Sequence, residues 1–545
     1  MGQDRMRELE REWERQGRSR REFFRLLGSG AGMATIAGVL GAGGGLAARL
    51  TGLESAVPSA LAATPQRGGT LIAAAGGEIK MDPYFQTAPT WIIQGQFYNA
   101  LFDYLGPDPF KIHGQLAESW NESDRQLTVT LRRGVKFHNG REVTAQDVVD
   151  NVNRALDKSI GHYLYDYFSP AVDGAEASEQ YTVKISYKKT YPLKLDDLTI
   201  LYLIPKEAMA EVATKPMGSG PFRFVSYFPG DQLQMERFDQ YWESGKPYLD
   251  KVTIKFIPDA QAKIANLRSG SLDFVDSLAP SDLVQLQKEG KYHIASSPAG
   301  GFWYCAVLNT ARKPLDNKLV RQALNYSIDR QKVNKLAFYD RAPATQSRYL
   351  PSSPWYNRAA ATRYSFDLKK AKALLDQAGY PNGFTTTISV SEPVVPGGKA
   401  MAQVWAQDLS TIGVTLTIVE KEQGRHFDDY FKGTYDIQGG WVLGDGKGDP
   451  ASGINNSSPL RTDNNRANIQ TQPFYAEYRK LVEDGVSSID FKVRKPIYDR
   501  IQEIWADEGW VVNVAFDVFS DVVSGRVNGF RMPIDQVPHF GTVWF

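Results

Sequence analysis

Apolar residues recur along this chain with two different spacings, that of strands and that of helices. The alternation of these two patterns restricts the possible folds more than any other feature. In "LTVTLRR" the apolar residues Leu127, Val129 and Leu131 alternate with other residues, which is the period of a strand with one buried face. In "FDLKKAKALLDQAG" the apolar residues recur at helical intervals, and the segment stops at Gly379. Segments of both kinds follow one another irregularly between breaks that contain Pro and Gly. The pattern predicts an α/β or α+β protein built in several lobes.

The length and composition indicate a soluble protein of more than one domain. Of 545 residues, roughly 480 follow an N-terminal leader, which suggests two or three hydrophobic cores. Hydrophobic residues make up 42% and charged residues 23%, as in ordinary globular proteins. The formal net charge is only +1, so we expect no nucleic-acid partner. Cys305 is the only cysteine and has apolar neighbours, which predicts a buried, inert thiol.

Residues 1–63 have the organisation of an export signal. Arg20 and Arg21 lie in "SRREFFR", directly before a Gly- and Ala-rich apolar run at 26–50 and the small residues "SALAA" at 59–63. The segment resembles a twin-arginine signal, which implies that the Tat translocase exports the folded chain to the periplasm or to the outer face of the cytoplasmic membrane. Gly and Ala bury little apolar area, so the run would be a weak membrane anchor. An uncleaved leader that remains as an anchor is the alternative.

No local motif predicts catalysis, a metal site or a cofactor. The six histidines show no zinc-binding spacing; they are His113, His138, His162, His293, His426 and His539. No nucleophile elbow, phosphate-binding loop or S-x-x-K motif is present. We therefore expect no enzyme, although a catalytic group assembled from distant residues leaves a secreted hydrolase as the alternative of another class.

Six segments, in order along the chain, carry a resemblance to one family. They are "RGGTLIAAAGGEIKMDP", "LAESWNESDRQLTVTLRRGVKFHNGREVTAQDVVDNVNRAL", "GSGPFRF", "ERFDQYWESGKPYLDKV", "LNTARKPLDNKLVRQALNYSIDR" and "DLKKAKALLDQAGYPNGF". The chain resembles the family 5 extracytoplasmic solute-binding proteins of peptide and nickel ABC importers, from about Gly68 to about Trp510. Met81 replaces a usual Leu, and Phe238-Asp239 stands where Asn is usual. Apart from the family, the two glycines of "GSGPF" are expected where two chain segments pass closely.

The resemblance implies an α/β, three-domain periplasmic-binding-protein-like fold (type II, cluster C), with two lobes that close around a ligand cleft. The expected parts are the export signal at 1–63, domain I at 64–103, 215–301 and 509–545, domain II at 104–214, and domain III at 302–508.

The resemblance also implies the role. We expect a monomeric receptor that captures short peptides outside the cytoplasmic membrane and delivers them to the permease subunits of an ABC importer. Oligosaccharides, nickel chelates and opine-like compounds are the alternative solutes within the family.

One candidate binding segment is "GGWVLGDGKGDP". In the family's peptide binders, a Trp lines a side-chain pocket and a following Asp pairs with the α-ammonium group of the peptide. The matching residues here are Trp441 and Asp445, with one residue more than the usual spacing between them, so Asp449 is a second candidate. A carboxylate in a dry cleft attracts an ammonium group strongly. Asx turns in a Gly-rich loop are the structural alternative.

Two further segments are candidate walls of the cleft. By position after the first strand, residues 86–89 would face the solute, which selects Gln86, Thr87 and Pro89. In "GGFWYCAVLN", Trp303 and Tyr304 are adjacent and would point to opposite faces of a strand. One or both would contact the solute, and packing in the core is the alternative.

Overall fold

The computed structural model describes residues 64–545, except 78, 86–90, 107, 109–110, 277, 298–301, 352, 393–394, 444–448, 452–466 and 518. These residues fall almost entirely in one compact unit, Gln66–Phe545. The export signal predicted at 1–63 lies outside the described residues.

A seven-stranded sheet is built from segments that are far apart in the sequence. Its order is β12 (Tyr292–Ser296), β18 (Ser520–Ser524), β11 (Phe274–Val275), β1 (Thr70–Ala75), β10 (Lys251–Phe256), β9 (Gln232–Arg237) and β8 (Phe222–Phe228). The central strand β1 is parallel to both of its neighbours. Helices α8 (Ala260–Ser269) and α9 (Pro280–Glu289) share one buried apolar cluster with this sheet, and α4 (Trp91–Phe97) shares another. Alternate residues of β1 belong to these two clusters, so both faces of the sheet are covered.

A four-stranded antiparallel sheet adjoins it and shares its core. The order is β4 (Ala117–Glu122), β5 (Gln126–Leu131), β7 (Thr182–Tyr187) and β6 (Val172–Glu179), and α5 (Ala145–Leu156) packs on it. The alternation predicted in β5 is confirmed, since Leu127, Val129 and Leu131 are all buried. Short elements complete this part: β2 (Phe102–Asp103), β3 (His113–Gly114), α6 (Leu164–Phe168) and α7 (Lys194–Asp197).

The "GSGPF" glycines lie where α4 ends, and the close approach of two chain segments that the sequence predicts there is confirmed. A Cβ atom on Gly218 would be 2.2 Å from the carbonyl oxygen of Phe97, and one on Gly220 would be 2.4 Å from that of Gln96. Any larger residue would force the two segments apart.

A five-stranded sheet forms the centre of the other half of the unit. Its order is β15 (Thr415–Glu420), β14 (Thr385–Val390), β16 (Ile437–Leu443), β13 (Phe302–Leu308) and β17 (Val511–Asp517). The accompanying helices are α10 (Lys318–Tyr326), α11 (Arg330–Ala337), α12 (Arg358–Ala361), α13 (Leu368–Gln377), α14 (Gly398–Ser410), α15 (Gln423–Lys432), α17 (Tyr475–Gly485) and α18 (Phe491–Glu508). Helix α13 ends two residues before Gly379, which has a left-handed φ of 88°.

The position of β17 corrects one predicted boundary. We expected the last part of domain I to begin at 509, but β17 pairs with β13 in the five-stranded sheet. The chain therefore leaves this sheet after Asp517 and enters the seven-stranded sheet at Ser520. The sequence pattern missed this because β17 and β18 are nearly continuous, and only their pairing partners assign them to different sheets.

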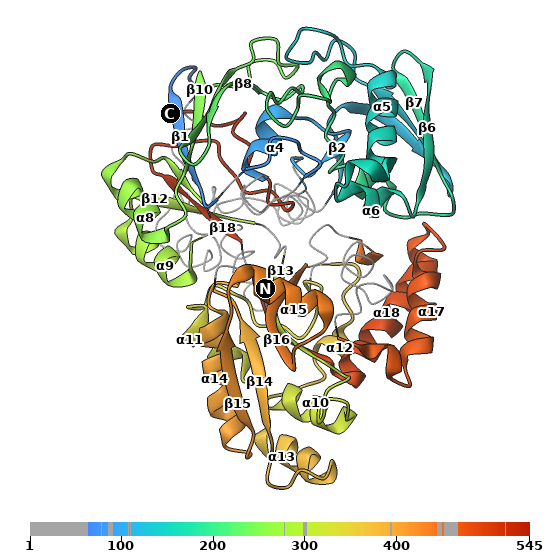
Figure 1. The fold of residues 1–545 in the computed structure, drawn as a ribbon, viewed down its shortest axis with the longest axis vertical. Coiled ribbons are helices and arrows are strands. Elements are labelled where there is room, and N and C mark those ends of the chain that lie inside the picture. Colours follow the sequence, from blue (N-terminus) through green and yellow to red (C-terminus); the bar gives the residue numbers. More distant parts are fainter. Residues whose placement is uncertain are drawn as a thin grey trace, which may run out of the picture. The chain divides into compact units, whose positions relative to one another are not determined.

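Two strand connections join the sheets, one between β12 and β13 and the other between β17 and β18. We call residues 66–297 and 519–545 the first lobe and residues 302–517 the second lobe; both are visible in Figure 1. The connections are bonded to each other, because the N–H of Ser297 donates to the carbonyl of Phe519 over 2.8 Å. The hydroxyl oxygens of Ser296 and Ser520 are also 2.8 Å apart. Two adjacent strands that cross between lobes are the arrangement of a hinge.

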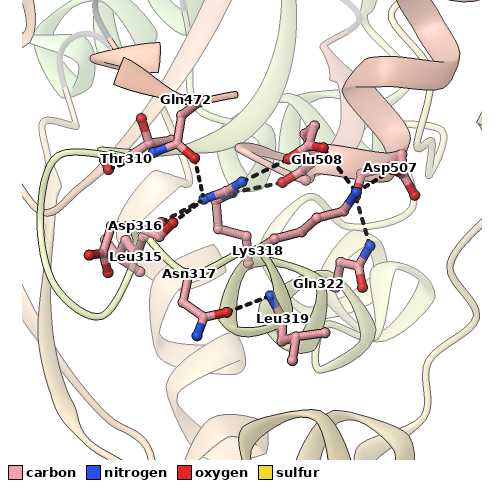
Figure 2. A network of polar contacts seen from close by, with 12 residues as sticks. Thr310, Leu315, Asp316, Asn317, Lys318, Leu319, Gln322, Gln472, Asp507 and Glu508 are labelled. Carbon is pink, nitrogen blue, oxygen red and sulfur yellow. Dashed lines mark hydrogen bonds and ion pairs between the residues drawn. The ribbon is translucent and has the colours of Figure 1, made fainter. Parts of the chain in front are cut away.

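A buried ion-pair network fixes α10 to the end of α18 (Figure 2). Arg321 is fully buried and donates to the backbone carbonyl of Glu508 over 2.7 Å and to its carboxylate over 3.0 Å. Its Nη1 group donates to the carbonyls of Leu315 and Asp316. Lys318 pairs with Glu508 from the exposed side over 2.9 Å. The network holds the second lobe together close to where β17 begins.

Candidate functional site

The second lobe begins at β13, and Trp303 is the first residue there whose side chain the structure describes. Trp303 is 1% exposed, and its indole N–H donates to Oδ1 of Asn513 over 2.5 Å. Asn513, on the neighbouring β17, donates to the backbone carbonyl of Gln346 over 2.9 Å. These bonds fix Trp303 between the edge strand and the segment that follows α11.

Arg348 lies between two tryptophan rings in this region. Its guanidinium carbon is 4.2 Å from the ring centres of both Trp303 and Trp505. A guanidinium covered on both faces makes its hydrogen bonds through its planar edge. Sequence reasoning missed Arg348 because its two aromatic neighbours are far away in the sequence and no local pattern marks them.

Tyr304 points to the opposite face of β13, as the predicted alternation requires. Its ring is stacked on Phe338, with 4.0 Å between ring centres, and the residue is 3% exposed. Trp303 and Tyr304 therefore belong to two different buried clusters of the second lobe. Packing in the core, the alternative that the sequence left open, describes both, and the structure gives no support to their predicted contact with the solute.

Most of the other predicted binding residues lie outside the described part. The backbone of Trp441, on β16, pairs with that of Tyr304 on β13. Trp441 therefore lies on the strand next to the one through which the chain enters the second lobe. The side chain of Trp441 and the residues Asp445, Gln86, Thr87 and Pro89 lie outside what the structure describes. Their contacts with a solute stay a prediction.

Asp449 is engaged inside the second lobe. Its two carboxylate oxygens accept bidentate bonds of 2.6 Å each from Arg494 on α18, and one also accepts from the N–H of Ala451 over 2.9 Å. Arg494 is 3% exposed, and although burial opposes it, the bonds to Asp449 raise the pKa of the guanidinium. This geometry favours a structural role for Asp449, which leaves Asp445 as the preferred candidate for the anchor.

Asp449→Ala is expected to lower stability and to leave solute affinity unchanged. Loss of the carboxylate leaves the buried Arg494 without its bidentate acceptor, at a cost of about 2 to 3 kcal/mol. Urea unfolding measures the stability, and calorimetric titration at 15 °C measures the affinity of the folded fraction. A variant that unfolds like the wild type but loses solute would transfer the anchor role to Asp449.

Apolar contacts join the lobes away from the hinge strands. Leu193 of the first lobe belongs to the same buried cluster as Tyr349 and Trp355 of the second lobe. Leu350 of the second lobe packs against the cluster formed by Tyr104 and Ile534 of the first. The lobes are therefore in contact through the segment around Tyr349 and Leu350 as well as through the crossing strands.

Asp521 is a buried carboxylate beside the hinge that sequence reasoning did not single out. It lies one residue after Ser520 on β18, is fully buried, and neither carboxylate oxygen has a hydrogen-bond partner. The nearby cation, Lys263, is paired with Asp276. Burial raises the pKa of Asp521 well above its usual range, the charge of Asp276 raises it further, and Lys263 opposes both.

The Asp521→Asn variant is expected to lose less stability than the wild type as the pH rises. The folded protein retains this proton at pH values where the unfolded chain, with a carboxyl pKa of about 4, has released it. The stabilisation is therefore complete below about pH 4 and is lost as pH rises toward the folded-state pKa. Melting temperatures from pH 4 to 8 should diverge in favour of the Asn variant, whereas Asp428→Asn, an exposed control on α15, should follow the wild type. Parallel curves for Asp521→Asn and wild type would show that Asp521 is not protonated in the folded state.

The histidines do not gather into a site. His426 is buried and His138 and His539 are half-buried, and desolvation lowers the pKa of each to about 4. Among the described residues, no group of three or more His, Cys, Asp or Glu side chains is arranged to hold a metal ion.

The arrangement of two lobes on paired crossing strands suits the enclosure of a solute, and comparison with known proteins agrees. The family model of bacterial extracellular solute-binding proteins, family 5, matches residues 111–464. The chain belongs to this family. It is therefore an extracytoplasmic solute-binding protein, and the resemblance inferred from the six sequence segments is confirmed.

Two curated relatives and one solved structure illustrate the similarity. The chain is 30% identical to heme-binding protein A of Haemophilus influenzae over 484 residues, which are 81% of this chain and 87% of the relative. It is 29% identical to the glutathione-binding protein GsiB of Pectobacterium atrosepticum over 509 residues, 90% and 96% of the two chains. The periplasmic binding protein DppA of Helicobacter pylori, in complex with peptide STSA, superposes with a TM-score of 0.75 at 25% identity and covers 88% of this chain and 98% of its own. In the part of this family 5 protein that the structure describes, none of the helices has the length and apolar character needed to cross a membrane.

Proposed function

We propose that this protein captures short peptides outside the cytoplasmic membrane and delivers them to the permease of an ABC importer. The observation that carries the proposal is the pair of bonded crossing strands between two lobes in a chain of this family. The peptide class is supported by a glutathione-binding relative, since glutathione is a tripeptide, and by a structural neighbour in complex with a tetrapeptide.

In this proposal Asp445 receives the α-ammonium group of the peptide and Trp441 lines a side-chain pocket. Residues 86–89 form the opposite wall and act through shape and backbone groups, because Gln86, Thr87 and Pro89 carry no charge. Main-chain hydrogen bonds would hold the peptide backbone and allow different side chains. The peptide is released intact, so no bond is broken.

The export route and the assembly complete the proposal. Arg20 and Arg21 direct the folded chain to the Tat translocase, and the receptor works as a monomer in the periplasm or at the outer face of the membrane. The parts at 64–103, 104–214, 215–301 and 302–517 act as the three-domain arrangement, with residues 519–545 returning to domain I.

Native mass spectrometry of protein purified from expressing cells tests the solute class. We expect a bound mass that corresponds to a short peptide in the wild type and its loss in Asp445→Ala. A sugar, a metal chelate or an opine-like compound bound instead would keep the receptor role and replace the peptide.

A further inference from the structure

Each lobe inserts one leucine into an apolar cluster of the other lobe. Leu193 of the first lobe is 3% exposed and belongs to a cluster whose other buried members, among the described residues, all lie in the second lobe. Leu350 of the second lobe packs in the opposite direction, against the cluster of Tyr104 and Ile534 in the first lobe. Neither leucine lies on a crossing strand, so these contacts are additional to those of the hinge.

The helix that follows Leu193 is anchored in the first lobe by a buried charge. Leu193 directly precedes α7, and Lys194, the first residue of α7, is fully buried. The Nζ group of Lys194 donates to the carboxylate of Glu122 over 3.2 Å and to the backbone carbonyl of Tyr191 over 2.7 Å. Loss of these acceptors would leave a buried ammonium group unpaired, so the start of α7 is held in one position.

Two buried carboxylates hold the other end of α7. Asp196 accepts a hydrogen bond of 2.5 Å from the hydroxyl of Tyr104, and Asp197 accepts one of the same length from the hydroxyl of Tyr191. Tyr104 also belongs to the cluster that receives Leu350. The anchor of α7 and the receiving cluster of the first lobe therefore share a residue, which makes the two insertions neighbours.

Leu350 comes from a segment that the second lobe holds firmly. Two residues earlier, the guanidinium of Arg348 lies between the rings of Trp303 and Trp505. Tyr349, between Arg348 and Leu350, is buried in the same cluster that receives the leucine of the first lobe. Adjacent residues of this segment therefore receive one leucine and supply the other.

We propose that Leu193 and Leu350 form a latch that holds the lobes in the described arrangement, and that the affinity for solute depends on this latch. Separation of the lobes would expose both leucines and the apolar groups that they cover, which is unfavourable in water. Two crossing strands allow the lobes to rotate, so the contacts between the lobes determine which arrangement is populated. The effect on affinity rests on the proposed capture of solute between the lobes, whereas the latch itself does not.

Double electron–electron resonance between spin labels, one in each lobe, tests the latch without any solute. Gln285→Cys on α9 and Gln403→Cys on α14 provide exposed positions for the labels, and the single native cysteine, Cys305, is buried (Figure 1). We expect Leu193→Ser to shift the ratio of the two lobe arrangements about tenfold away from the one that dominates in the wild type, because a buried leucine is lost from the contact.

A second variant and a matched control keep this test specific. Leu193→Ser changes the residue that precedes α7, so Leu350→Ser breaks the same latch from the second lobe and should produce the same new distance. Leu336→Ser removes a leucine that is 53% exposed on α11 and should give the distances of the wild type. Unchanged distances in both latch variants, or an equal change in Leu336→Ser, would overturn the proposal.

Calorimetric titration with Ser-Thr-Ser-Ala separates the latch from the proposed function. Both latch variants should bind this peptide several-fold to about tenfold more weakly than the wild type, and Leu336→Ser should bind it equally well. Equal or tighter binding by the latch variants would overturn the inference and leave the peptide receptor intact. If the wild type itself bound no peptide, the proposed function would fail, and the interlobe distances would still decide whether the latch exists.

Discussion

Replacing Asp445 with alanine is expected to weaken peptide binding by about 30-fold to several thousand-fold, without a change in fold. A carboxylate that faces an ammonium group in a closed cleft is poorly screened by water, and removal of one partner of such a pair costs about 2 to 5 kcal/mol. Isothermal titration with glutathione and with the peptide Ser-Thr-Ser-Ala measures the loss.

Asp428→Ala is the matched control for Asp445→Ala. It removes the same charge from an exposed position on α15, where Asp428 pairs with Lys432 at the surface, and should change affinity less than twofold. N-acetylated Ser-Thr-Ser-Ala, which lacks the ammonium group, should bind the wild type as weakly as the free peptide binds Asp445→Ala. If the acetylated and free peptides bound the wild type equally, the ammonium contact would be refuted.

Arg321→Ala is expected to destabilise the second lobe by about 3 to 5 kcal/mol. The side chain is fully buried, and its loss removes the Arg321 donor from one carboxylate oxygen of Glu508 and from the backbone carbonyls of Glu508, Leu315 and Asp316. Burial lowers the pKa of Arg321, and the charge of Glu508 and its hydrogen bond to Arg321 oppose that shift. Urea unfolding followed by tryptophan fluorescence measures the loss, since Trp510 lies two residues beyond Glu508.

Lys318→Ala supplies the comparison within the same network. Lys318 pairs with Asp507 and Glu508, but its side chain is 39% exposed, so solvent screens the pair and the expected cost is at most about 1 kcal/mol. A similar cost for Arg321→Ala and Lys318→Ala would show that burial does not strengthen the Arg321 contact.

Local sequence patterns predicted the elements of this fold well. The alternation in Leu127–Leu131, the stop of α13 near Gly379 and the close approach at Gly218 and Gly220 all follow from short-range rules, and the structure has them. The sheet assignment of β17 did not follow, because it depends on pairing with β13 across some two hundred residues.

The candidate site was less predictable for the same physical reason. The alternation of Trp303 and Tyr304 was correct, but a strand in the middle of a sheet buries both faces, so neither ring is exposed. The environments of Arg348 and Asp521 arise from distant segments that leave no local signature. The surroundings of a buried ionisable side chain become visible only once its neighbours in space are known.

Calorimetric titration of the wild type with glutathione, Ser-Thr-Ser-Ala and haem, followed by mass analysis of the recovered solute, tests the central claim most directly. The account predicts that one molecule of at least one of the two peptides binds per chain and is recovered intact. Binding of haem alone, or recovery of a cleaved peptide, would contradict it.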